Sequence, residues 1–537
     1  MSDAALFWNA VALEVQRRDY TYHDAYGEDE GSTSMDRQVL MPEQSGPTHV
    51  SRAMAMMHLA MFDAAHTIKK VDIGSSAQIS AYLPSVKEAL PATPSGVSRG
   101  AAIGAAAGSV LKQLFTRQHI YIDQQLKLWE GSLFERGDSR ASINQGKHFG
   151  GAIGDLYFDH RKMDNSDKSI ADPAYSSKDL PGVFRPDPFM PTQNILGAGW
   201  GNVTPFCIGD MKAVEEGFVP PQGKAGLGKY LGGENWPADL AEIRAKGAAD
   251  GTAGLTRTAE ETVVGIFWGY DGSRGIGVPT RLYNQCVRSI SEASNLSEDQ
   301  NLVLFATVNM VMADAGIAAW REKFKYHVGR PVTVIREAGT GFGPDQSPSP
   351  GNPTTPSLGS SNPTFETGRL EIPIPVTDYD GIDAWLKTTP TVPSMVAGDI
   401  TWSPLGAPQT NTSGAYTRTP PFPAYPSGHA TFGAACFESV RRALAAFRLP
   451  WDCAFVMKSD ELNGVNTDAH GDTRPIHRRS MTLAQAIHES AVSRLYLGVH
   501  WRMDAVEGVR LGLDVLEKAA AAGRGPASLL TPTPSNG

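Results

Sequence analysis

The chain has 537 residues, enough for two core units or one large fused core, and 41% hydrophobic residues with 20% charged ones are ordinary for a soluble globular protein. The net charge of −9 offers no general attraction for nucleic acid or an anionic membrane, so neither is an expected partner. The four widely spaced cysteines form no CxxC or Cys/His pattern, so the sequence predicts neither a disulfide framework nor a zinc site.

The first half of the chain, residues 1–165, is predicted to be helical. Apolar residues recur at helical spacing from Met54 to Ala65, and an alanine-rich apolar segment covers residues 101–115. The N-terminus has no basic region followed by a long apolar one, so no secretory signal is predicted. We therefore expect a soluble protein that is cytoplasmic or exported by a non-classical route.

An irregular connection is predicted for residues 166–249, which are rich in Pro, Gly, Asp and Ser. Residues 250–522 then form a second helical half. Its longest apolar run, Leu302–Trp320, is interrupted by Asn309 and Asp314. Length and polarity therefore favour a buried bundle helix over a membrane span.

Three further segments are predicted to be irregular. The density of glycine and proline in residues 338–363 predicts a mobile surface loop, and the alternation in 370–376 allows a short extended piece at an edge. Residues 523–537 are expected to be a frayed tail. Because strand-like alternation is scarce elsewhere, the predicted fold class is all-α, with two helical-bundle halves and long irregular loops.

Three short stretches in the second half carry the chemistry. They are Lys323–Pro331, Pro426–His429 and Ser493–Asp504. Together they supply three cations, one hydroxyl, one backbone N–H before a helix, and two histidines. Charge-assisted bonds from Lys and Arg hold phosphate-like oxygens most strongly. The combination indicates a site that grips a tetrahedral oxyanion, although each stretch alone is a weak signal.

The first stretch offers two candidate anion ligands. Lys323 and Arg330 are about two helical turns apart, so both can face one point, with Gly329 loosening the helix end and Pro331 pushing Arg330 toward an extended conformation. Lys325 competes with Lys323, but it lies on a different face of the helix. The alternative interpretation is a solvated basic helix end, which the helix dipole favours in any case.

The second stretch is predicted to begin a helix. Prolines make the approach to Ser427 stiff, and an apolar helical stripe follows from Phe432. Ser427 is therefore expected at or near an N-cap, where free N–H groups attract an anion, and Gly428 lets the anion come close to the backbone. The alternative is an ordinary serine cap followed by an exposed histidine, His429.

In the third stretch, the helix must end between Arg494 and His500 if both residues are to reach the anion site. On a continuous helix Arg494 and His500 would not share a face, but Gly498 between them can end the helix and bring them together. Asp504 lies four residues after His500, so it can hold the second ring nitrogen and fix the tautomer. The alternative for this pair is a surface ion pair of little energetic value.

Taken together, the motifs resemble the superfamily of type 2 phosphatidic acid phosphatases and vanadium-dependent haloperoxidases. The resemblance to the chloroperoxidase branch extends to both halves of the chain, through Leu6–Glu14, Ser51–Ala60, Glu461–Val465 and Leu497–Asp504. It implies two helical bundles with the site inside the second one. It also implies vanadate as cofactor, and hydrogen peroxide and halide as partners.

The resemblance further assigns roles to the motif residues. It implies that His500 bonds directly to vanadium, that His429 hydrogen-bonds the apical oxygen and acts as acid and base, and that Lys323 polarises the peroxide. The vanadate oxygens would be held by Lys323, Arg330, Ser427, the Gly428 N–H and Arg494.

Three other positions follow from the same resemblance. Trp320 and Phe422 match aromatic residues that line the halide approach in fungal-type chloroperoxidases, whereas algal-type bromoperoxidases have a histidine at the second position. Plain core aromatics are the alternative interpretation. Asp271 looks like the family acid that pairs with Arg494, behind the anion.

The resulting expectation is a vanadate-dependent haloperoxidase that converts chloride or bromide to hypohalous acid, with an organic acceptor as a further candidate partner. The alternative is a soluble acid phosphatase that uses His500 as phosphoryl acceptor and His429 as general acid. The three motifs do not separate the two, because phosphate and vanadate are isosteric. A non-enzymatic oxyanion-binding protein is a third hypothesis, but it leaves the second histidine unexplained. The sequence carries no signal for the oligomeric state.

Overall fold

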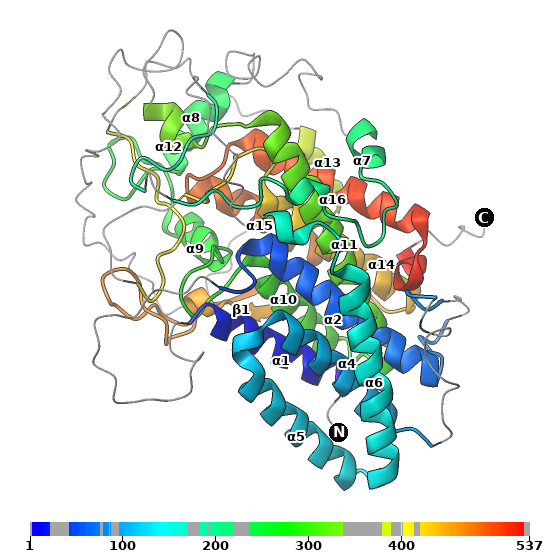
Figure 1. Ribbon diagram of the computed structural model, residues 1–537. Helices are drawn as coiled ribbons and strands as arrows, with labels where there is room; N and C mark the ends of the chain where they lie inside the picture. The colour runs from blue at the N-terminus through cyan, green and yellow to red at the C-terminus, as the bar shows by residue number, and fades with distance from the viewer. Residues whose placement is uncertain are drawn as a thin grey trace.

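The computed structural model describes residues 3–21, 42–75, 79–84, 86, 96–169, 182–190, 193–217, 236–336, 379–387, 399, 401–412 and 419–530. The loop expected at 338–363 and the extended piece expected at 370–376 lie outside these residues. Helices dominate the described chain, which confirms the all-α prediction (Figure 1). The proposed domain boundaries near 165, 249 and 522 stay predictions.

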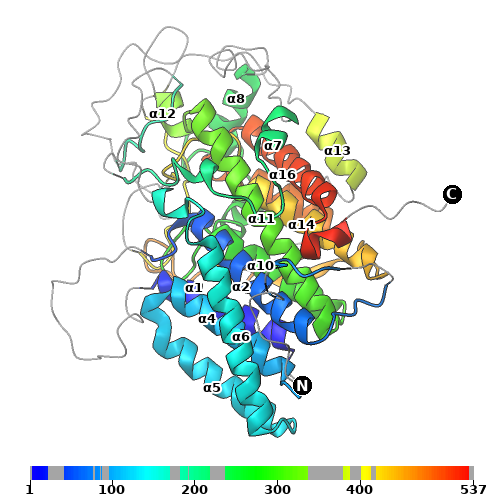
Figure 2. The same cartoon turned by 45° about the vertical axis from the view of Figure 1, so that its right-hand side comes forward.

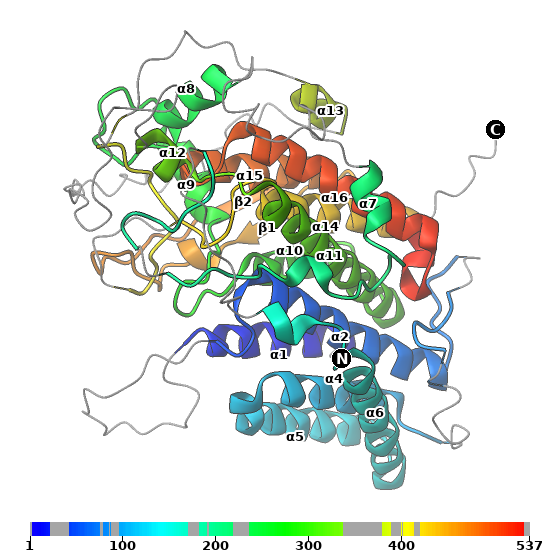
Figure 3. The same ribbon diagram turned by 45° about the horizontal axis from the view of Figure 1, so that its top comes forward.

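The N-terminal half forms a layer of helices on one side of the molecule (Figure 3). It contains α1 (Ala4–Asp19), α2 (Gly46–Ile68), α4 (Arg99–Leu114), α5 (His119–Glu135) and α6 (Arg140–Arg161). Helices α4 and α6 pack backbone to backbone, and a Cβ added at Gly150 would lie 2.0 Å from the carbonyl oxygen of Ala102. A row of small residues is therefore what lets this layer form.

The C-terminal half is arranged around one long helix, α11. Its helices are α9 (Ala259–Phe267), α10 (Pro279–Ala293), α11 (Glu298–Tyr326), α14 (Gly428–Ala446), α15 (Leu483–Tyr496) and α16 (Arg502–Ala522). Helix α11 contacts α2 of the first half and both α14 and α16 of the second, as Figure 2 shows from a second side. The apolar residues of both halves therefore join in one hydrophobic core.

Among the described helices, α11 alone is long and apolar enough to cross a membrane, and its apolar window is completely buried inside the protein. This burial confirms that Leu302–Trp320 is a bundle helix of the core. The helix begins with a capping box from Ser297 and Gln300 and ends at Tyr326, where the C-cap residue His327 has a φ of 54° in the left-handed conformation.

Short elements connect and cover these helices. They are η1 (Thr116–Gln118), η2 (Ser166–Ser169), η3 (Trp200–Asn202), α7 (Lys212–Gly217), α8 (Trp236–Lys246), α12 (Pro331–Arg336), α13 (Tyr379–Lys387), η6 (Asp460–Leu462) and η7 (Gly525–Leu530). The one sheet in the described chain pairs β1 (Phe455–Lys458) with β2 (Arg478–Met481) in antiparallel fashion.

The C-terminal end corrects one prediction. Residues 525–530 were expected to fray, but they form η7, and Ala527, Leu529 and Leu530 are buried. The prediction of a frayed tail after 523 is therefore wrong as far as Leu530. The apolar triplet of this segment packs against α14 and α16, which offsets the loss of chain entropy.

Candidate functional site

The three motif stretches meet at one place inside the C-terminal half. The end of α11, the start of α14 and the turn between α15 and α16 bring together side chains that are far apart in the sequence. All of them are buried in the protein, and they are Lys323, Arg330, Ser427, His429, Arg494 and His500. The cluster predicted from the motifs is therefore formed.

Lys323 is fully buried, and its ammonium group is tied to the backbone that precedes α14. The Nζ atom donates to the carbonyl oxygens of Pro423 and Ala424, each at 2.9 Å, and to that of Pro426. These bonds use all three N–H donors of the lysine. Lys325, the competing cation, instead forms an ion pair with Glu215 at 2.7 Å. Lys323 is therefore the lysine that faces the site.

Arg330 reaches the site by a different route from the one expected. Because α11 ends at Tyr326, Lys323 and Arg330 do not share a helix, and the prediction that helical spacing aligns them is wrong. Arg330 donates from Nε to the Phe422 carbonyl at 2.9 Å and from Nη1 to His500 Nε2 at 2.9 Å. Its second terminal nitrogen, Nη2, is buried without a partner.

Ser427 is the N-cap of α14, as the sequence predicted. Its hydroxyl accepts from the Ala430 N–H at 3.4 Å, and the helix begins at Gly428. The N–H groups of the first turn have no acceptor within the helix, so this end is electropositive. A Cβ added at Gly428 would lie 3.2 Å from the Trp320 ring. Glycine therefore keeps the helix end open to a ligand.

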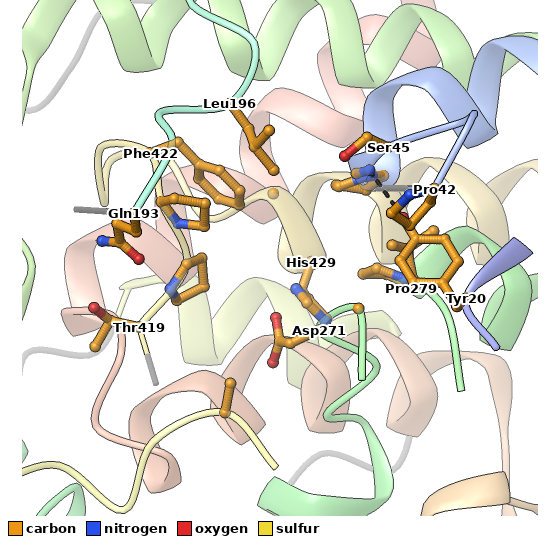
Figure 4. Close-up of a pocket in the computed structure, with 18 of the residues that line it drawn as sticks. Tyr20, Pro42, Ser45, Gln193, Leu196, Asp271, Pro279, Thr419, Phe422 and His429 are labelled. Atoms are coloured by element: carbon orange, nitrogen blue, oxygen red, sulfur yellow. Dashed lines mark hydrogen bonds between the residues drawn. The ribbon is translucent and has the colours of Figure 1, made fainter. Parts of the chain in front are cut away.

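His429 points into the cavity beside this helix end (Figure 4). Burial and the positive charges of Arg494, Arg330 and Lys323 hold its pKa well below the ordinary value, whereas a hydrogen bond to the backbone of Trp268 opposes this shift. The ring is therefore neutral at ordinary pH. Its Nε2 atom is buried without a hydrogen-bond partner, so it is available to a ligand.

The break predicted at Gly498 is confirmed. Helix α15 ends at Tyr496, Gly498 has a φ of +69°, and a Cβ there would lie 2.1 Å from the Gly247 carbonyl oxygen. Only glycine fits this turn without strain. The turn brings Arg494, at the end of α15, and His500, just before α16, to the same site.

Asp504 holds His500 and fixes its tautomer. The His500 Nδ1 atom lies 3.0 Å from Asp504 Oδ2, which also accepts from the Trp501 N–H at 2.9 Å. An arginine can only donate, so the bond from Arg330 makes Nε2 the unprotonated nitrogen and leaves the ring proton on Nδ1. The predicted contact between His500 and Asp504 is confirmed. The two residues do not share a helix face, however, because His500 precedes α16.

Arg494 forms the predicted ion pair with Asp271. Its Nη2 atom donates to both carboxylate oxygens, at 2.9 and 2.8 Å. The Nε and Nη1 atoms are buried and have no partner. Asp271 therefore fixes one edge of the guanidinium, and the remaining N–H groups are left for another acceptor.

The electrostatics of the site favour an anion. Burial lowers the pKa of Arg330 to about 9, and burial with the repulsion of Arg330 holds the pKa of Lys323 well below its ordinary value. Burial also raises the pKa of the Asp504 carboxyl to about 7. A bound anion would attract all of these cations and so offset the electrostatic repulsion between them. It would also satisfy buried donors that cost about 1–3 kcal/mol each when unpaired.

An aromatic pair borders the cations. The Trp320 and Phe422 rings are 4.7 Å apart, and Lys323 Nζ lies 5.6 and 5.2 Å from their centroids. Both rings are buried, so they also belong to the core, as the alternative interpretation held. Because they line the cavity that reaches His429 as well, they form an apolar rim next to the positive charge.

The opposite wall of this cavity was not foreseen from the sequence. Tyr20 and Ser45 of the first half line it, across the cavity from Phe422 and Gln193 (Figure 4). The three backbone carbonyls that hold Lys323 were not predicted either. These contacts join segments that are far apart along the chain, and no local pattern marks them.

Comparisons with known proteins agree with this arrangement. The family model of the vanadium chloroperoxidase N-terminal domain matches residues 2–197, and that of the second helical-bundle domain matches residues 303–524. The vanadium chloroperoxidase of Curvularia inaequalis is 27% identical to the chain, over 93% of this chain and 78% of that protein.

Two solved structures share the fold. A bacterial vanadium-dependent iodoperoxidase superposes with a TM-score of 0.57 at 18% identity, covering 96% of this chain and 94% of its own. A bacterial vanadium-dependent chloroperoxidase in its holo form gives a TM-score of 0.57 at 14% identity, covering 94% and 97%. At these identities the likeness concerns the fold alone.

Proposed function

The chain belongs to the vanadium-dependent haloperoxidase family, and we propose that it oxidises chloride or bromide with hydrogen peroxide, with vanadate as cofactor. The net reaction consumes hydrogen peroxide, one halide and one proton, and gives hypohalous acid and water. The observation that carries the proposal is the set of buried, unpaired nitrogen atoms on Arg330, Arg494 and His429 around a histidine with an unprotonated Nε2. That donor set fits an oxyanion of vanadium.

In this proposal each residue has a separate task. His500 would bond vanadium through Nε2, in place of the hydrogen bond that it now accepts from Arg330. Arg330, Arg494, Ser427 and the Gly428 N–H would hold the oxygens. When bound, vanadate supplies the Lewis-acidic centre that makes peroxide oxygen electrophilic toward a halide.

His429 would move the protons. Its neutral ring, whose Nε2 has no hydrogen-bond partner, can accept a proton from incoming hydrogen peroxide and return it to the oxygen that leaves as water. Lys323 would add fixed positive charge in a buried site, where charge acts more strongly than in water. A direct hydrogen bond from Lys323 to the substrate would require it to release one of its carbonyls.

The apolar rim would set the halide choice. Trp320 and Phe422 strip water from a small anion beside three cations, which favours chloride as well as the more easily oxidised bromide. Membrane and nucleic acid are not proposed partners. A cytoplasmic or non-classically exported location stays a prediction.

The proposed function is tested by removing and restoring vanadate. Protein stripped with a chelator at low pH should lose halide-dependent peroxide consumption, and added vanadate should restore it. Inorganic phosphate should compete with vanadate, because the same donors bind both anions. Halogenation that persists in protein verified to be vanadium-free would refute the cofactor. Efficient hydrolysis of phosphate esters without halide oxidation would favour the phosphatase instead.

Phe422→His is expected to lower the chloride-to-bromide ratio of kcat/KM. The substitution places a polar, titratable group in the rim, 4.7 Å from Trp320 between ring centroids in the wild type. Chloride, the harder anion to oxidise, should therefore lose more activity than bromide. Phe422→Leu is the matched control, because it keeps the rim apolar. Wild-type protein that oxidises bromide but no chloride at any pH would contradict this assignment.

A further inference from the structure

The end of helix α1 is fastened to the start of helix α2 at the wall of the cavity. Tyr20 is the C-cap residue of α1, and its hydroxyl donates to the Gln44 carbonyl at 3.3 Å and accepts from the Gly46 N–H at 2.9 Å. The Asp19 carboxylate accepts from the N–H groups of Glu43 and Gln44, at 2.9 and 3.0 Å. The Tyr20 side chain is therefore fixed at both ends, by its backbone on α1 and by its hydroxyl on α2.

The Tyr20 ring lies against the loop that carries Asp271. This loop folds back on itself through a hydrogen bond from the Gly272 N–H to the Gly277 carbonyl at 2.8 Å. A Cβ added at Gly272 would lie 3.5 Å from Tyr20 Cε1, and one added at Gly277 would lie 4.0 Å from Tyr20 Cδ2. The Gly275 N–H also donates to the Tyr20 carbonyl at 3.1 Å. The ring and the backbone of Tyr20 therefore both support the loop.

A second set of bonds holds the same loop from the C-terminal half. The Ser273 hydroxyl donates to the Pro408 carbonyl, and Asn411 Nδ2 donates to the Arg274 carbonyl at 2.8 Å. Because Tyr20 belongs to the N-terminal half, the loop is supported by both halves of the chain. Its position therefore depends on how the two halves pack against each other.

The loop sets the orientation of Arg494 through Asp271. Both Asp271 carboxylate oxygens accept from Arg494 Nη2, at 2.9 and 2.8 Å, whereas Nε and Nη1 of the same guanidinium are buried without a partner. A planar guanidinium that is fixed along one edge presents its other N–H groups in a set direction. Donors that are already oriented lose less conformational entropy when they bind a ligand. A shift of the loop should therefore weaken the hold of Arg494 on an anion.

We propose that Tyr20 is a positioning residue of the anion site, which acts through the Asp271 loop on Arg494. Its hydroxyl is already bonded to Gln44 and Gly46, so Tyr20 does not offer it to the anion. Figure 4 shows Tyr20 at one side of the cavity, with Asp271 and His429 nearer its centre. The proposal rests on the anion site of the proposed function, but it does not depend on which halide is oxidised.

The test is a double-mutant cycle of Tyr20→Ala and Asp271→Ala, in which calorimetry measures the binding of phosphate to vanadate-free protein. Tyr20→Ala should weaken phosphate binding by about 3- to 30-fold, a range typical of residues coupled through direct contacts. In the Asp271→Ala background the same substitution should change the affinity by no more than about twofold, because the link to Arg494 is already broken. Removal of the Asp271 charge changes the anion affinity by itself, so the two effects of Tyr20→Ala are compared with each other.

Tyr82→Ala is the matched control for a general loss of stability. Tyr82 is another buried tyrosine of the N-terminal half, and its hydroxyl donates to the Phe206 carbonyl at 2.9 Å. This variant should lower the melting temperature and leave the phosphate affinity unchanged. Tyr20→Leu covers the case in which Tyr20→Ala fails to fold, because it keeps apolar bulk but has no hydroxyl to fix it on α2. Its loss of phosphate affinity should disappear with Asp271→Ala in the same way.

The outcomes separate this proposal from the proposed function. Wild-type phosphate affinity in folded Tyr20→Ala or Tyr20→Leu would overturn the positioning role alone. A loss that keeps its full size in the Asp271→Ala background would also overturn it, because Tyr20 would then act by another route. Vanadate-loaded wild-type protein that oxidises no halide would overturn the proposed function, while the phosphate cycle would still decide the role of Tyr20. Wild-type protein that binds neither phosphate nor vanadate would overturn both proposals.

Discussion

His429→Ala is expected to keep vanadate bound and to lose about 10²- to 10⁴-fold in kcat, the usual contribution of a general acid or base. The ring is buried, its Nε2 has no hydrogen-bond partner, and it has no part in the bonds that orient His500. Removing it therefore takes away a proton carrier but not a proposed metal ligand. Equilibrium dialysis of vanadate and steady-state kinetics with bromide measure the two effects separately.

Two further measurements make this prediction sharper. The wild-type pH profile of kcat should contain one limb that is absent in His429→Ala, because the limb reports titration of the ring in the loaded enzyme. Added imidazole should restore part of the lost turnover by occupying the space of the missing ring. A variant with wild-type turnover, or one that has lost vanadate, would contradict the assigned role.

Local sequence signals were sufficient for part of the site. Ser427 was recognised as an N-cap because stiff prolines precede it and a helical stripe follows it. Gly498 was recognised as a possible break because a glycine between Arg494 and His500 can end a helix, and the structure gives it a φ of +69°. Both inferences depend on the conformation of a few neighbouring residues, which the sequence encodes directly.

Other parts were right for an incomplete reason or were missed. Arg330 and Asp504 do join the site, but both bonds to His500 run across a chain turn and not along a helix face. The carbonyls that hold Lys323 come from residues about 100 positions away in the sequence. The cavity wall around Tyr20 comes from the other half of the chain. Such contacts are set by how helices pack, and no local pattern reports them.

His500→Ala is expected to cause the largest loss of vanadate affinity of any single change. Its unprotonated Nε2 is the only proposed direct bond to vanadium, and Asp504 makes that nitrogen more basic through the opposite side of the ring. Asp504→Asn should lower the affinity for vanadate by about 10- to 100-fold, as loss of such a supporting residue commonly does. The loss of vanadate affinity in His500→Ala should be larger than the loss in Asp504→Asn.

Phosphate and a second buried histidine serve as controls for this loss. Phosphate would be held only by hydrogen bonds and charge, so His500→Ala should weaken the binding of phosphate far less than the binding of vanadate. His488→Ala removes another buried histidine, which packs on Trp385 with ring centroids 5.0 Å apart, and should leave vanadate affinity unchanged. Equilibrium dialysis of vanadate and phosphate with His500→Ala, Asp504→Asn and His488→Ala measures these differences in affinity. If His500→Ala and His488→Ala bound vanadate equally well, the metal ligand would have to be sought elsewhere among the residues around His429.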